Sequence, residues 1–432
     1  MLSTQSFGEM SLPAFQKIQQ YFRNVSMLSR NAKLYLVATL LQGLGFGIWG
    51  VIFNLYLKLG EVGFQADFIG YMFTASAIAT GFVAMPAGLV CERIGSKKAL
   101  LIGLTANFAN IVLIVVLQPH LLLFASLVSG LIGTVGWVAS APFMTENSKL
   151  EERTYLFSVN WATMIIMGVI GSYLGGAMPD SINALLGLSI GENGSALGYR
   201  ITLGISTILT LAAIVPILLI KEEKMLHKQR LSDLLILRNI KSGKTILKFI
   251  IPASLIGFGA GFIVPLFNLF FSLKFSATNE QIGLMFALSN VTLGVGTFVA
   301  PALSKRLGKV KSVALCEYLS MPFIMLTTLA PNLPLAGSAF ITRNALMNMA
   351  GPISSTLQME LVTETERATT SGLLVMADNI PRAITASFSG KMMTGNDFYT
   401  PFLFTTATYF VASTLFYLFF RKAETQKTRM LN

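Results

Sequence analysis

The chain has 432 residues and a formal net charge of +12; 53% of its residues are hydrophobic and only 12% are charged. Soluble domains carry roughly 25% charged residues, so this composition excludes an ordinary soluble fold and places the chain in a lipid bilayer. The positive charge does not indicate a nucleic-acid partner, because no soluble segment is long enough to gather basic and aromatic side chains on one folded face.

Residues 1–33 precede the first long apolar run. They lack the apolar core and the small-residue cleavage site of a signal peptide, so we expect a cytoplasmic N-terminal arm. The alternation of Phe15, Ile18, Tyr21 and Phe22 with polar residues is compatible with a helix lying at the membrane interface.

Apolar runs long enough to cross a bilayer, which takes about 20 residues of helix, recur from residue 34 to residue 420. We expect twelve spans and an all-α membrane protein, with a six-helix bundle over residues 34–220 and a second over residues 245–420. The expected spans are residues 34–58, 68–90, 99–117, 121–144, 155–178, 201–220, 245–273, 281–303, 312–329, 335–357, 369–392 and 401–420.

The longest polar stretch between two spans covers residues 221–244. Basic residues alternate there with Leu231, Leu234, Leu235 and Leu237. We expect a cytoplasmic linker, either an amphipathic helix on the anionic leaflet or a solvated tether. Residues 421–432 would form a cytoplasmic tail.

Basic residues are distributed unevenly between the two predicted sides of the membrane. One set of alternate loops, with both termini, holds most of the lysines and arginines, whereas the other set holds only Lys58, Arg200, Lys274 and Lys391. The positive-inside rule therefore predicts a multi-pass protein of the inner (plasma) membrane with both termini cytoplasmic.

Few residues of the chain are of the kinds that bind metals or catalyse reactions. Cys91 and Cys316 are the only cysteines and cannot build a disulfide framework. His120 and His227 fall in loops on opposite sides of the predicted membrane, so no Cys/His metal site forms. No nucleophile, base and orienting group occur together, and no phosphate-binding loop is present. We expect neither an enzyme nor a cofactor.

The second half of the chain repeats the first. The motif GLGFG at Gly43 and the FNLYL that follows it return as GFGAG at Gly257 and FNLFF, so Asn54 corresponds to Asn268. Two similar, lipid-soluble halves suggest two bundles that rock against each other around a site on the pseudo-symmetry axis, which is the outline of a secondary transporter.

Basic, glycine-containing loops follow the second and eighth spans. They read GLVCERIGSK from Gly88 and PALSKRLGK from Pro301, and Glu-Arg pairs follow the fourth and tenth spans. This arrangement resembles the major facilitator superfamily, whose loop reads Gly-x-Leu-x-Asp-Arg-x-Gly-Arg-Lys, over nearly the whole chain from Leu34 to Phe420. The resemblance implies two pseudo-symmetric six-helix bundles and transport by alternating access.

The resemblance also implies that these loops form a conformational latch. A positive φ at Gly95 would turn the chain sharply, and Glu92 could then reach a basic residue or a helix N-terminus of the other bundle. In the second loop Lys305 replaces the acidic residue, so its latch would be weaker or absent. The alternative is that these charges only fix the topology. The predicted latch residues are Gly88, Glu92, Arg93, Gly95, Arg153, Arg306, Gly308 and Arg367.

Charged residues at mid-membrane positions cost on the order of 2.5–3.5 kcal/mol each and therefore usually face a cavity. Asp378 and Arg382 are one turn apart and can pair. One hypothesis is a neutral ion pair that orients helices. The other is that Arg343 and Arg382 attract a negative group of a substrate while Asp378 exchanges a proton. Glu317 lies in a span that we expect to be peripheral, where packing is its expected role.

The first bundle offers uncharged polar and aromatic residues instead, which are either core residues or the wall of a pocket. A cavity with aromatic walls on one side and charges on the other would suit an amphipathic organic molecule. The predicted substrate-binding residues are Gln42, Trp49, Asn54, Trp137, Asn160, Asn268, Arg343, Asn344 and Arg382, and Asp378 is the predicted proton-coupling residue.

The sequence therefore predicts a monomeric secondary transporter of a small organic solute or amphipathic drug-like compound, with protons as the coupling ion and membrane lipids around it. Glycines of the fifth span resemble an element of the family's drug:proton antiporters, which would mean efflux, although close helix packing explains them more simply. Two alternatives remain open: a lipid or lysolipid flippase of the same fold, and a membrane receptor or scaffold that transports nothing.

Overall fold

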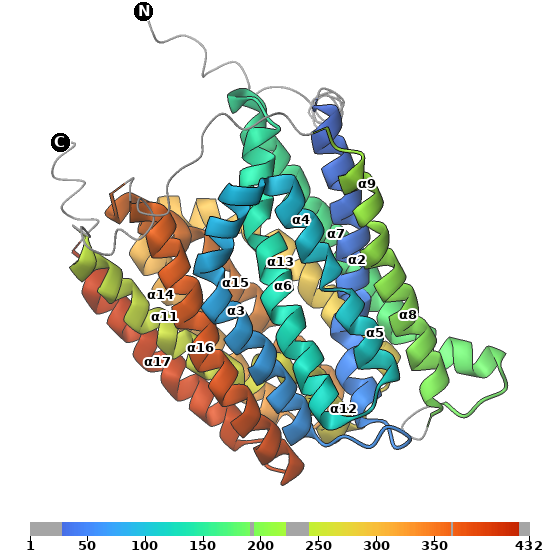
Figure 1. The fold of residues 1–432 in the computed structure, drawn as a ribbon. Coiled ribbons are helices and arrows are strands. Elements are labelled where there is room, and N and C mark those ends of the chain that lie inside the picture. The colour runs from blue at the N-terminus through green and yellow to red at the C-terminus, as the bar shows by residue number, and fades with distance from the viewer. Residues whose placement is uncertain (1–27, 191–193, 222–241, 364–365, 423–432) are drawn as a thin grey trace, which may run out of the picture.

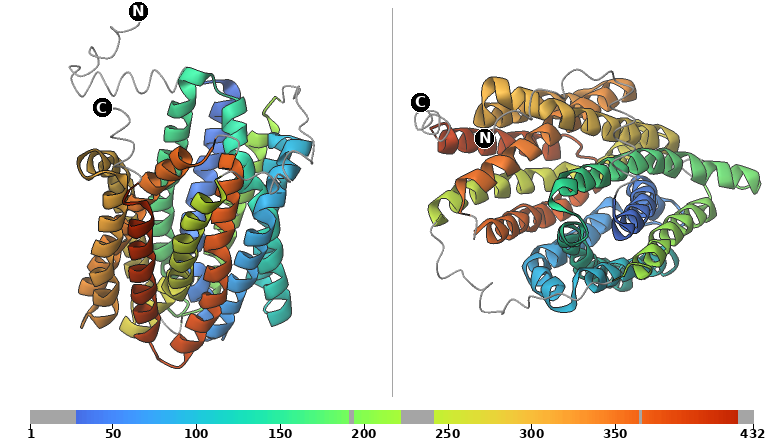
Figure 2. Two further views of the ribbon diagram at one scale, coloured as in Figure 1. Left: turned by 90° about the vertical axis from the view of Figure 1, so that its left-hand side faces the viewer. Right: turned by 90° about the horizontal axis from the view of Figure 1, so that it is seen from above.

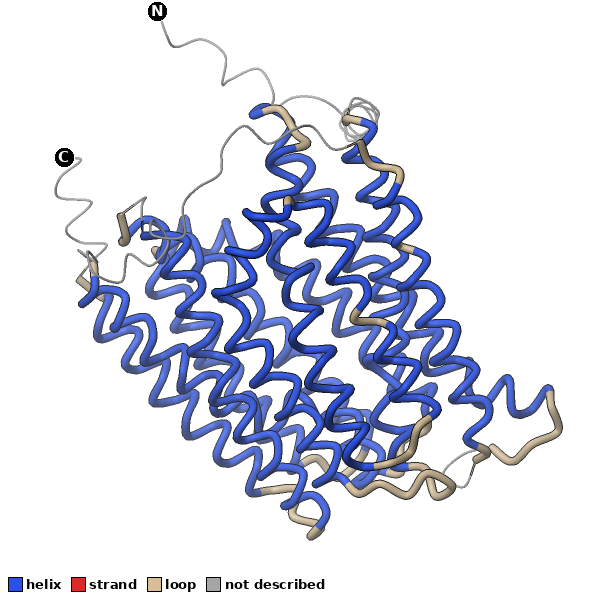
Figure 3. The backbone as a smooth tube through the Cα atoms, in the orientation of Figure 1, coloured by secondary structure: helices blue, strands red, loops and turns tan. Residues whose placement is uncertain are grey.

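The structure of the protein, a computed structural model, describes residues 28–190, 194–221, 242–363 and 366–422 (Figure 1). Within these residues every regular element is a helix, and short loops join the helices at the two ends of the bundle (Figure 3). The predicted all-α membrane fold is confirmed. Residues 1–27 of the predicted arm, most of the predicted linker and residues 423–432 of the predicted tail lie outside the described residues.

Six helical spans make up the first half of the chain. Two of them are interrupted by short breaks, which divide the third span into α4 and α5 and the sixth into α8 and α9. The helices are α2 (Arg30–Lys58), α3 (Ala66–Ile94), α4 (Ser96–Thr105), α5 (Phe108–Val115), α6 (Pro119–Glu146), α7 (Leu150–Leu185), α8 (Ala196–Ala212) and α9 (Ile214–Leu218).

The second half repeats this pattern. Its first span contains a short 3-10 helix, η3, at Pro265, which has no backbone N–H to continue an α-helix. The helices are α11 (Gly243–Ile263), η3 (Val264–Leu266), α12 (Phe267–Phe275), α13 (Asn279–Leu307), α14 (Lys309–Leu329), α15 (Leu333–Leu361), α16 (Arg367–Thr394) and α17 (Thr400–Phe420).

By length and composition, nine of the described helical segments can cross a membrane, and α13 makes a tenth if its two bent parts count as one. Helices α15 and α16 fall short of that criterion. They carry the charged residues Arg343, Asp378 and Arg382, which lower the hydropathy of spans that otherwise match the predicted ranges.

The predicted spans were approximate, and the largest difference from them lies at the end of the fifth span. The fifth span was expected to end at residue 178, but α7 continues through Pro179 to Leu185. The side chain of Asn183 donates to the carbonyl oxygen of Ser195 (2.8 Å) and accepts from the backbone N–H of Gly198 (2.9 Å). These two bonds fasten the last turns of α7 to the start of α8, a tertiary contact that local sequence does not reveal.

The glycines of the repeated motif explain how each half packs. A Cβ atom placed on Gly47 would lie 2.6 Å from the carbonyl oxygen of Gly168 in α7, and one on Gly261 would collide with the carbonyl oxygen of Arg382 in α16. Gly45 and Gly259 make room chiefly for side chains, those of Thr210 in α8 and of Thr408 and Tyr409 in α17. The motif therefore lets α2 and α11, the first spans of the two halves, touch α7 and α16 through the backbone and pack closely on α8 and α17.

The helices of the first half, blue to green, gather on one side of the bundle and those of the second half, yellow to red, on the other (Figure 2). The halves meet mainly where α3 packs on α16 and α7 packs on α13. A Cβ atom on Gly70 would lie 2.6 Å from the carbonyl oxygen of Ala386, and one on Gly176 would lie 2.8 Å from the Cα atom of Gly283. Backbone therefore meets backbone at both contacts.

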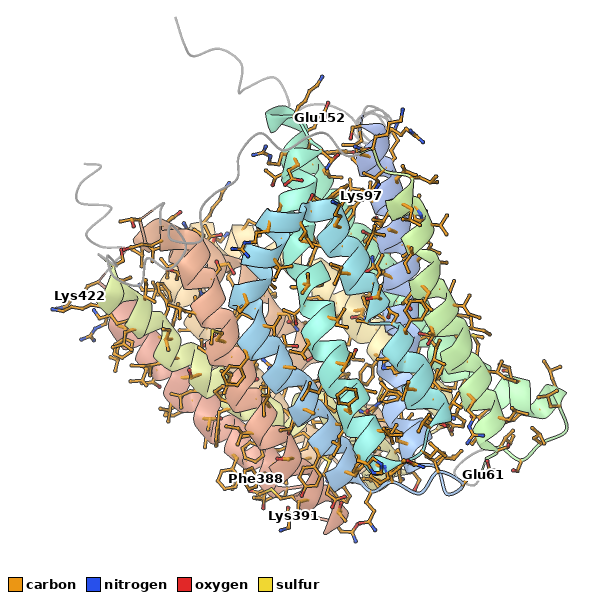
Figure 4. The ribbon with its side chains drawn as sticks, in the orientation of Figure 1. Glu61, Lys97, Glu152, Phe388, Lys391 and Lys422 are labelled. Carbon is orange, nitrogen blue, oxygen red and sulfur yellow. The ribbon has the colours of Figure 1, made fainter. Side chains whose placement is uncertain are left out.

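We call the end of the bundle that holds Arg30 and Phe420 the terminal end, and the opposite end the distal end. Figure 4 places Lys97, Glu152 and Lys422 at the terminal end and Glu61 and Lys391 at the distal end. Most of the basic residues that the structure describes belong to the terminal end. This asymmetry agrees with the unequal charge of the predicted loops.

Candidate functional site

A cavity of about 550 Å³ lies between the two halves, and we call it the central cavity. Helices α2, α3, α5 and α6 line it from the first half, and η3, α12, α13 and α16 line it from the second. Its aromatic lining residues are Trp49, Phe53, Phe73 and Phe286. Its polar lining residues are Asn54, Ser76, Thr80, Asn110, Ser126, Ser129, Asn268, Asn379 and Arg382.

Asn54 and Asn268, which the repeat predicts to be equivalent, meet at the distal side of this cavity. Asn54 Nδ2 donates to Asn268 Oδ1 (2.8 Å) and to the carbonyl oxygen of Pro265 (3.0 Å). Asn268 Nδ2 donates to the carbonyl oxygen of Val51 (2.8 Å). Each amide thus reaches the carbonyl three positions before the other asparagine, as a pseudo-twofold axis requires. We call this reciprocal contact the asparagine clasp.

Arg382 lines the central cavity, and Asp378 neutralises it from one turn away on α16. The guanidinium makes a bidentate contact, with Arg382 Nε 3.1 Å from Asp378 Oδ2 and Nη2 2.7 Å from both Asp378 Oδ1 and Oδ2. The side chains are only 25% and 31% exposed. The pairing that the sequence predicts is therefore observed, and the charge at this wall of the cavity is balanced.

Arg343 lies inside the second half and does not line the central cavity. It is buried, donates through Nη1 to Asn344 Oδ1 (2.8 Å) and through Nη2 to the hydroxyl of Tyr409 (3.0 Å). Its guanidinium also lies 5.7 Å from the ring centroids of Phe267 and Tyr409. Asn344 in turn donates to Ser289 Oγ (2.6 Å). These contacts join α12, α13, α15 and α17 within one half.

Three other predicted substrate residues line a second cavity of about 340 Å³ within the first half, which we call the side cavity. Gln42, Trp137 and Asn160 belong to its wall, and Asn160 Oδ1 accepts a hydrogen bond from Thr39 (2.8 Å). The indole of Trp137 is 66% exposed. Ser129 lines both cavities. Of the nine predicted residues, Trp49, Asn54, Asn268 and Arg382 thus lie at the central cavity.

The predicted latch residues lie at the terminal end. Gly95 and Gly308 have φ angles of 91° and 84°, and the positive φ expected at Gly95 is therefore observed. Arg153 Nη2 donates to the carbonyl oxygen of Thr145 (3.2 Å), within the first half. Arg93 and Arg306 are exposed, and a Cβ atom on Gly88 would meet no atom within 4 Å. The side chains of Glu92 and Arg367 lie outside what the structure describes.

Sequence reasoning missed two acidic residues at these loops. Ser96, directly after Gly95, hydrogen-bonds to Glu146 at the end of α6. Lys309, directly after Gly308, forms an ion pair with Glu360 near the end of α15. The repeat relates these two contacts to each other. Comparing the ends of the fourth and tenth spans would have revealed the paired glutamates.

Hydrogen bonds between the two halves gather toward the distal end. Asn279 donates to Asp180 Oδ2 (3.0 Å) and to the hydroxyl of Tyr199 (2.6 Å). Thr74 donates to the carbonyl oxygen of Ala383 (2.6 Å). At the terminal end, the described residues form no hydrogen bond between the halves. These bonds join the halves at the distal end of the central cavity, whereas a Cβ atom on Gly88 of α3 or on Gly372 of α16, toward the terminal end, would meet no described atom within 4 Å.

Sequence reasoning also missed the uncharged polar wall of the central cavity in the first half. Ser76 and Thr80 come from α3, Asn110 from α5, and Ser126 and Ser129 from α6. Hydroxyl and amide side chains are common in spanning helices, where many bond to their own backbone. The spacing of Ser76 with Thr80 and of Ser126 with Ser129 places each pair on one helix face and is the signal that sequence offered.

A family model described as Major Facilitator Superfamily matches residues 35–253 and 249–430. No protein among the curated sequences matches the chain. Among solved structures, a point mutant of the nucleoside transporter NupG has a TM-score of 0.70 at 16% identity, with 89% of this chain and 98% of that chain covered.

A bacterial homologue of the human lysosomal transporter Spinster, in an inward-facing and unoccupied conformation, has a TM-score of 0.72 at 14% identity, with 90% of this chain and 96% of that chain covered. A proton-dependent oligopeptide transporter has a TM-score of 0.68 at 12% identity, with 89% and 97% covered. At these identities the likeness concerns the fold.

Proposed function

The chain belongs to the major facilitator superfamily, and from that premise we propose that it is a monomeric secondary transporter that moves a small organic solute by alternating access. The observation that carries this proposal is the central cavity, which lies between two related halves and is closed on its distal side by the asparagine clasp. A cavity closed on one side only is what a transporter needs in order to present its substrate to one compartment at a time.

The charge distribution supports an orientation. Lys97, Lys98 and Lys422 lie at the terminal end, with other basic residues. The positive-inside rule assigns this end to the cytoplasm. In the proposed orientation the protein spans the inner (plasma) membrane, and the arrangement described here faces inward, because the distal side is closed.

Proton coupling is the proposed energy source, and Asp378 is the proposed carrier. It is a carboxylate beside the central cavity, and its ion pair with Arg382 would be broken by protonation. Breaking the pair would expose an unbalanced guanidinium to the cavity, so the protonation state of one residue would change how the cavity holds a solute.

The uncharged polar lining favours a solute over a lipid. A flippase needs an apolar groove for acyl chains, whereas the central cavity carries polar groups on both of its walls. A receptor or scaffold moves nothing across the membrane. Measuring whether a solute, a lipid or neither is transported therefore discriminates among the three functions.

The test is uptake by purified protein in liposomes. The proteoliposomes are incubated in a defined mixture of sugars, nucleosides, amino acids and organic acids, with and without an inward proton gradient, and their contents are identified by mass spectrometry. We expect at least one solute to accumulate above the level in protein-free liposomes. If none does under either condition, the chain does not transport these classes of solute, and the proposal fails.

A further inference from the structure

We infer that the transported solute is an uncharged ring compound that carries several hydroxyl groups and one flat apolar face. This inference rests on the proposed function and names the chemical class of its substrate. A monosaccharide and a nucleoside both have this chemistry.

The charge of the central cavity excludes an ion as the preferred substrate. Arg382 is the one charged residue among the described residues that line it, and Asp378 already neutralises that guanidinium through a bidentate contact. Arg343, the other arginine at this depth, is occupied by Asn344 and Tyr409 away from the cavity. While Asp378 is ionised and paired with Arg382, an ionised solute would lose its water shell in this cavity without gaining a partner of opposite charge.

The hydroxyl groups of the cavity wall are available to a ligand. The hydroxyl groups of Ser76, Thr80, Ser126 and Ser129 form no hydrogen bond with any residue that the structure describes, although all four residues line the cavity. Neighbouring hydroxyls on the same helices behave differently: Thr74 and Thr134 bond to backbone carbonyls one turn away. A hydroxyl both donates and accepts, so this wall matches a ligand edge that does the same.

Asn110 adds an acceptor to this wall of the first half, and Asn379 adds one to the opposite wall, which the second half forms. Asn110 donates through Nδ2 to Asn107 Oδ1 (3.2 Å), and Asn379 donates through Nδ2 to the carbonyl oxygen of Val375 (2.9 Å). Their Oδ1 atoms accept no hydrogen bond from the described residues and remain available to the cavity. The wall of the first half therefore offers both donors and acceptors, and the wall of the second half offers an acceptor. The hydroxyl groups of a polyol can donate to the acceptors on both walls, whereas a carboxylate can only accept.

The aromatic residues supply the apolar face. Trp49 stacks on Phe53 with 4.5 Å between ring centroids, and Phe286 lines the cavity from the second half. The volume of about 550 Å³ falls in the range of roughly 300 to 1,000 Å³ found for small-molecule sites. A ring compound with one apolar face can lie against these rings while its polar edge meets the serines and threonine.

The test uses pairs of solutes that differ in charge. Proteoliposomes containing the full chain are given uridine against uridine monophosphate, and glucose against glucuronate, and the uptake of each is measured. We expect the uncharged member of at least one pair to enter about tenfold faster than its charged partner. The sugar and nucleoside arms decide between the two sources of this chemistry.

Substitutions in the wall of the central cavity test whether this cavity recognises the preferred solute. Thr80→Ala and Ser126→Ala should each slow uptake of the preferred solute about fivefold to tenfold, the effect of one lost hydrogen bond to a ligand. Thr145→Ala on α6 is the matched control, because Thr145 is half-buried, lines neither cavity, and its hydroxyl donates to the carbonyl oxygen of Ala141. All three should unfold at the wild-type temperature, and Ser129→Ala replaces any that does not.

Three results would overturn this inference. Preferential uptake of the charged members would leave transport intact and contradict the substrate class. Equal uptake rates for Thr80→Ala, Ser126→Ala and Thr145→Ala would show that the cavity hydroxyls do not take part in substrate recognition. No uptake of any solute in the mixture or in the pairs would overturn the proposed function itself.

Discussion

Asn54 and Asn268 occupy equivalent positions of the two halves, 214 residues apart, and their side chains hydrogen-bond to each other across the interface. Each also takes a carbonyl oxygen of the opposite half, at Pro265 and Val51. Every hydrogen bond of the clasp is donated by a side-chain amide, so the clasp can open without disturbing the helices that carry it. This makes it a suitable closure for the distal side of the central cavity.

Replacing either asparagine should favour opening at the distal end. Asn54→Ala removes two hydrogen bonds between the halves, worth about 1–2 kcal/mol together, and should shift the conformational equilibrium about tenfold. The shift is measured from the distance between spin labels at residues 185 and 391, both exposed at the distal end, with Cys91 and Cys316 replaced by alanine.

Asn268→Ala should produce the same shift, and the double variant should exceed either single one by less than their sum, because both remove the same contact. Asn348→Ala is the control, since its amide bonds only to the carbonyl oxygen of Asn344 within α15. Unchanged label distances in both clasp variants would mean that other contacts close the distal end.

Gly261→Ala should destabilise the second half. The added methyl group would collide with the carbonyl oxygen of Arg382 and with Thr385 Oγ1, separating α11 from α16 at a cost of about 1–3 kcal/mol. A lower melting temperature in detergent is the expected result.

Gly204→Ala in α8 is the matched control for that measurement, because a Cβ atom there meets no atom within 4 Å. It should melt at or above the wild-type temperature, since alanine favours helix over glycine by up to about 1 kcal/mol. If Gly261→Ala and Gly204→Ala have the same melting temperature, the repeated glycines are not needed for close packing.

Sequence predicted the repeat and the equivalence of Asn54 with Asn268, because both follow from matching residues along the chain. It did not predict that Arg343 is buried within its own half. A mid-membrane arginine can face a cavity or a neighbouring tyrosine, and the choice depends on how α15 is rotated against α12 and α17. For the same reason Ser126 and Ser129 went unnoticed, since only the rotation of α6 distinguishes a cavity serine from a packing serine.

Asp378→Asn should abolish uptake driven by a pH gradient while leaving exchange of labelled for unlabelled solute at equal pH. The asparagine keeps the shape of the carboxylate but can neither carry a proton nor balance the charge of Arg382. The measurement is proteoliposome uptake with and without an imposed proton gradient.

Glu360→Gln serves as the control for coupling. It breaks the partly exposed ion pair with Lys309 at the terminal end, where such pairs contribute at most about 1 kcal/mol, and it should respond to the gradient as the wild type does. A wild-type response in Asp378→Asn would exclude this residue as the proton carrier.

Gly88 and Gly372 should come together when the terminal end closes. Helices α3 and α16 run antiparallel, and their register passes from Gly70 beside Ala386, through Thr74 beside Ala383, to Gly81 beside Ile380. One further step of about two turns on each helix brings Gly88 opposite Gly372. In the present arrangement a Cβ atom on either glycine meets no atom within 4 Å, whereas Gly70 at the closed end touches backbone.

A bulky residue at position 88 should therefore fit in the present arrangement. It should be incompatible with the state in which the terminal end is closed. Gly88→Leu is expected to keep the wild-type melting temperature, yet to lower the uptake rate by more than about tenfold, because closing the terminal end would bury the new side chain against α16. Gly204→Leu, equally uncrowded but on α8 away from α16, should transport normally. Normal uptake by Gly88→Leu would show that the two helices never meet at this point of the cycle.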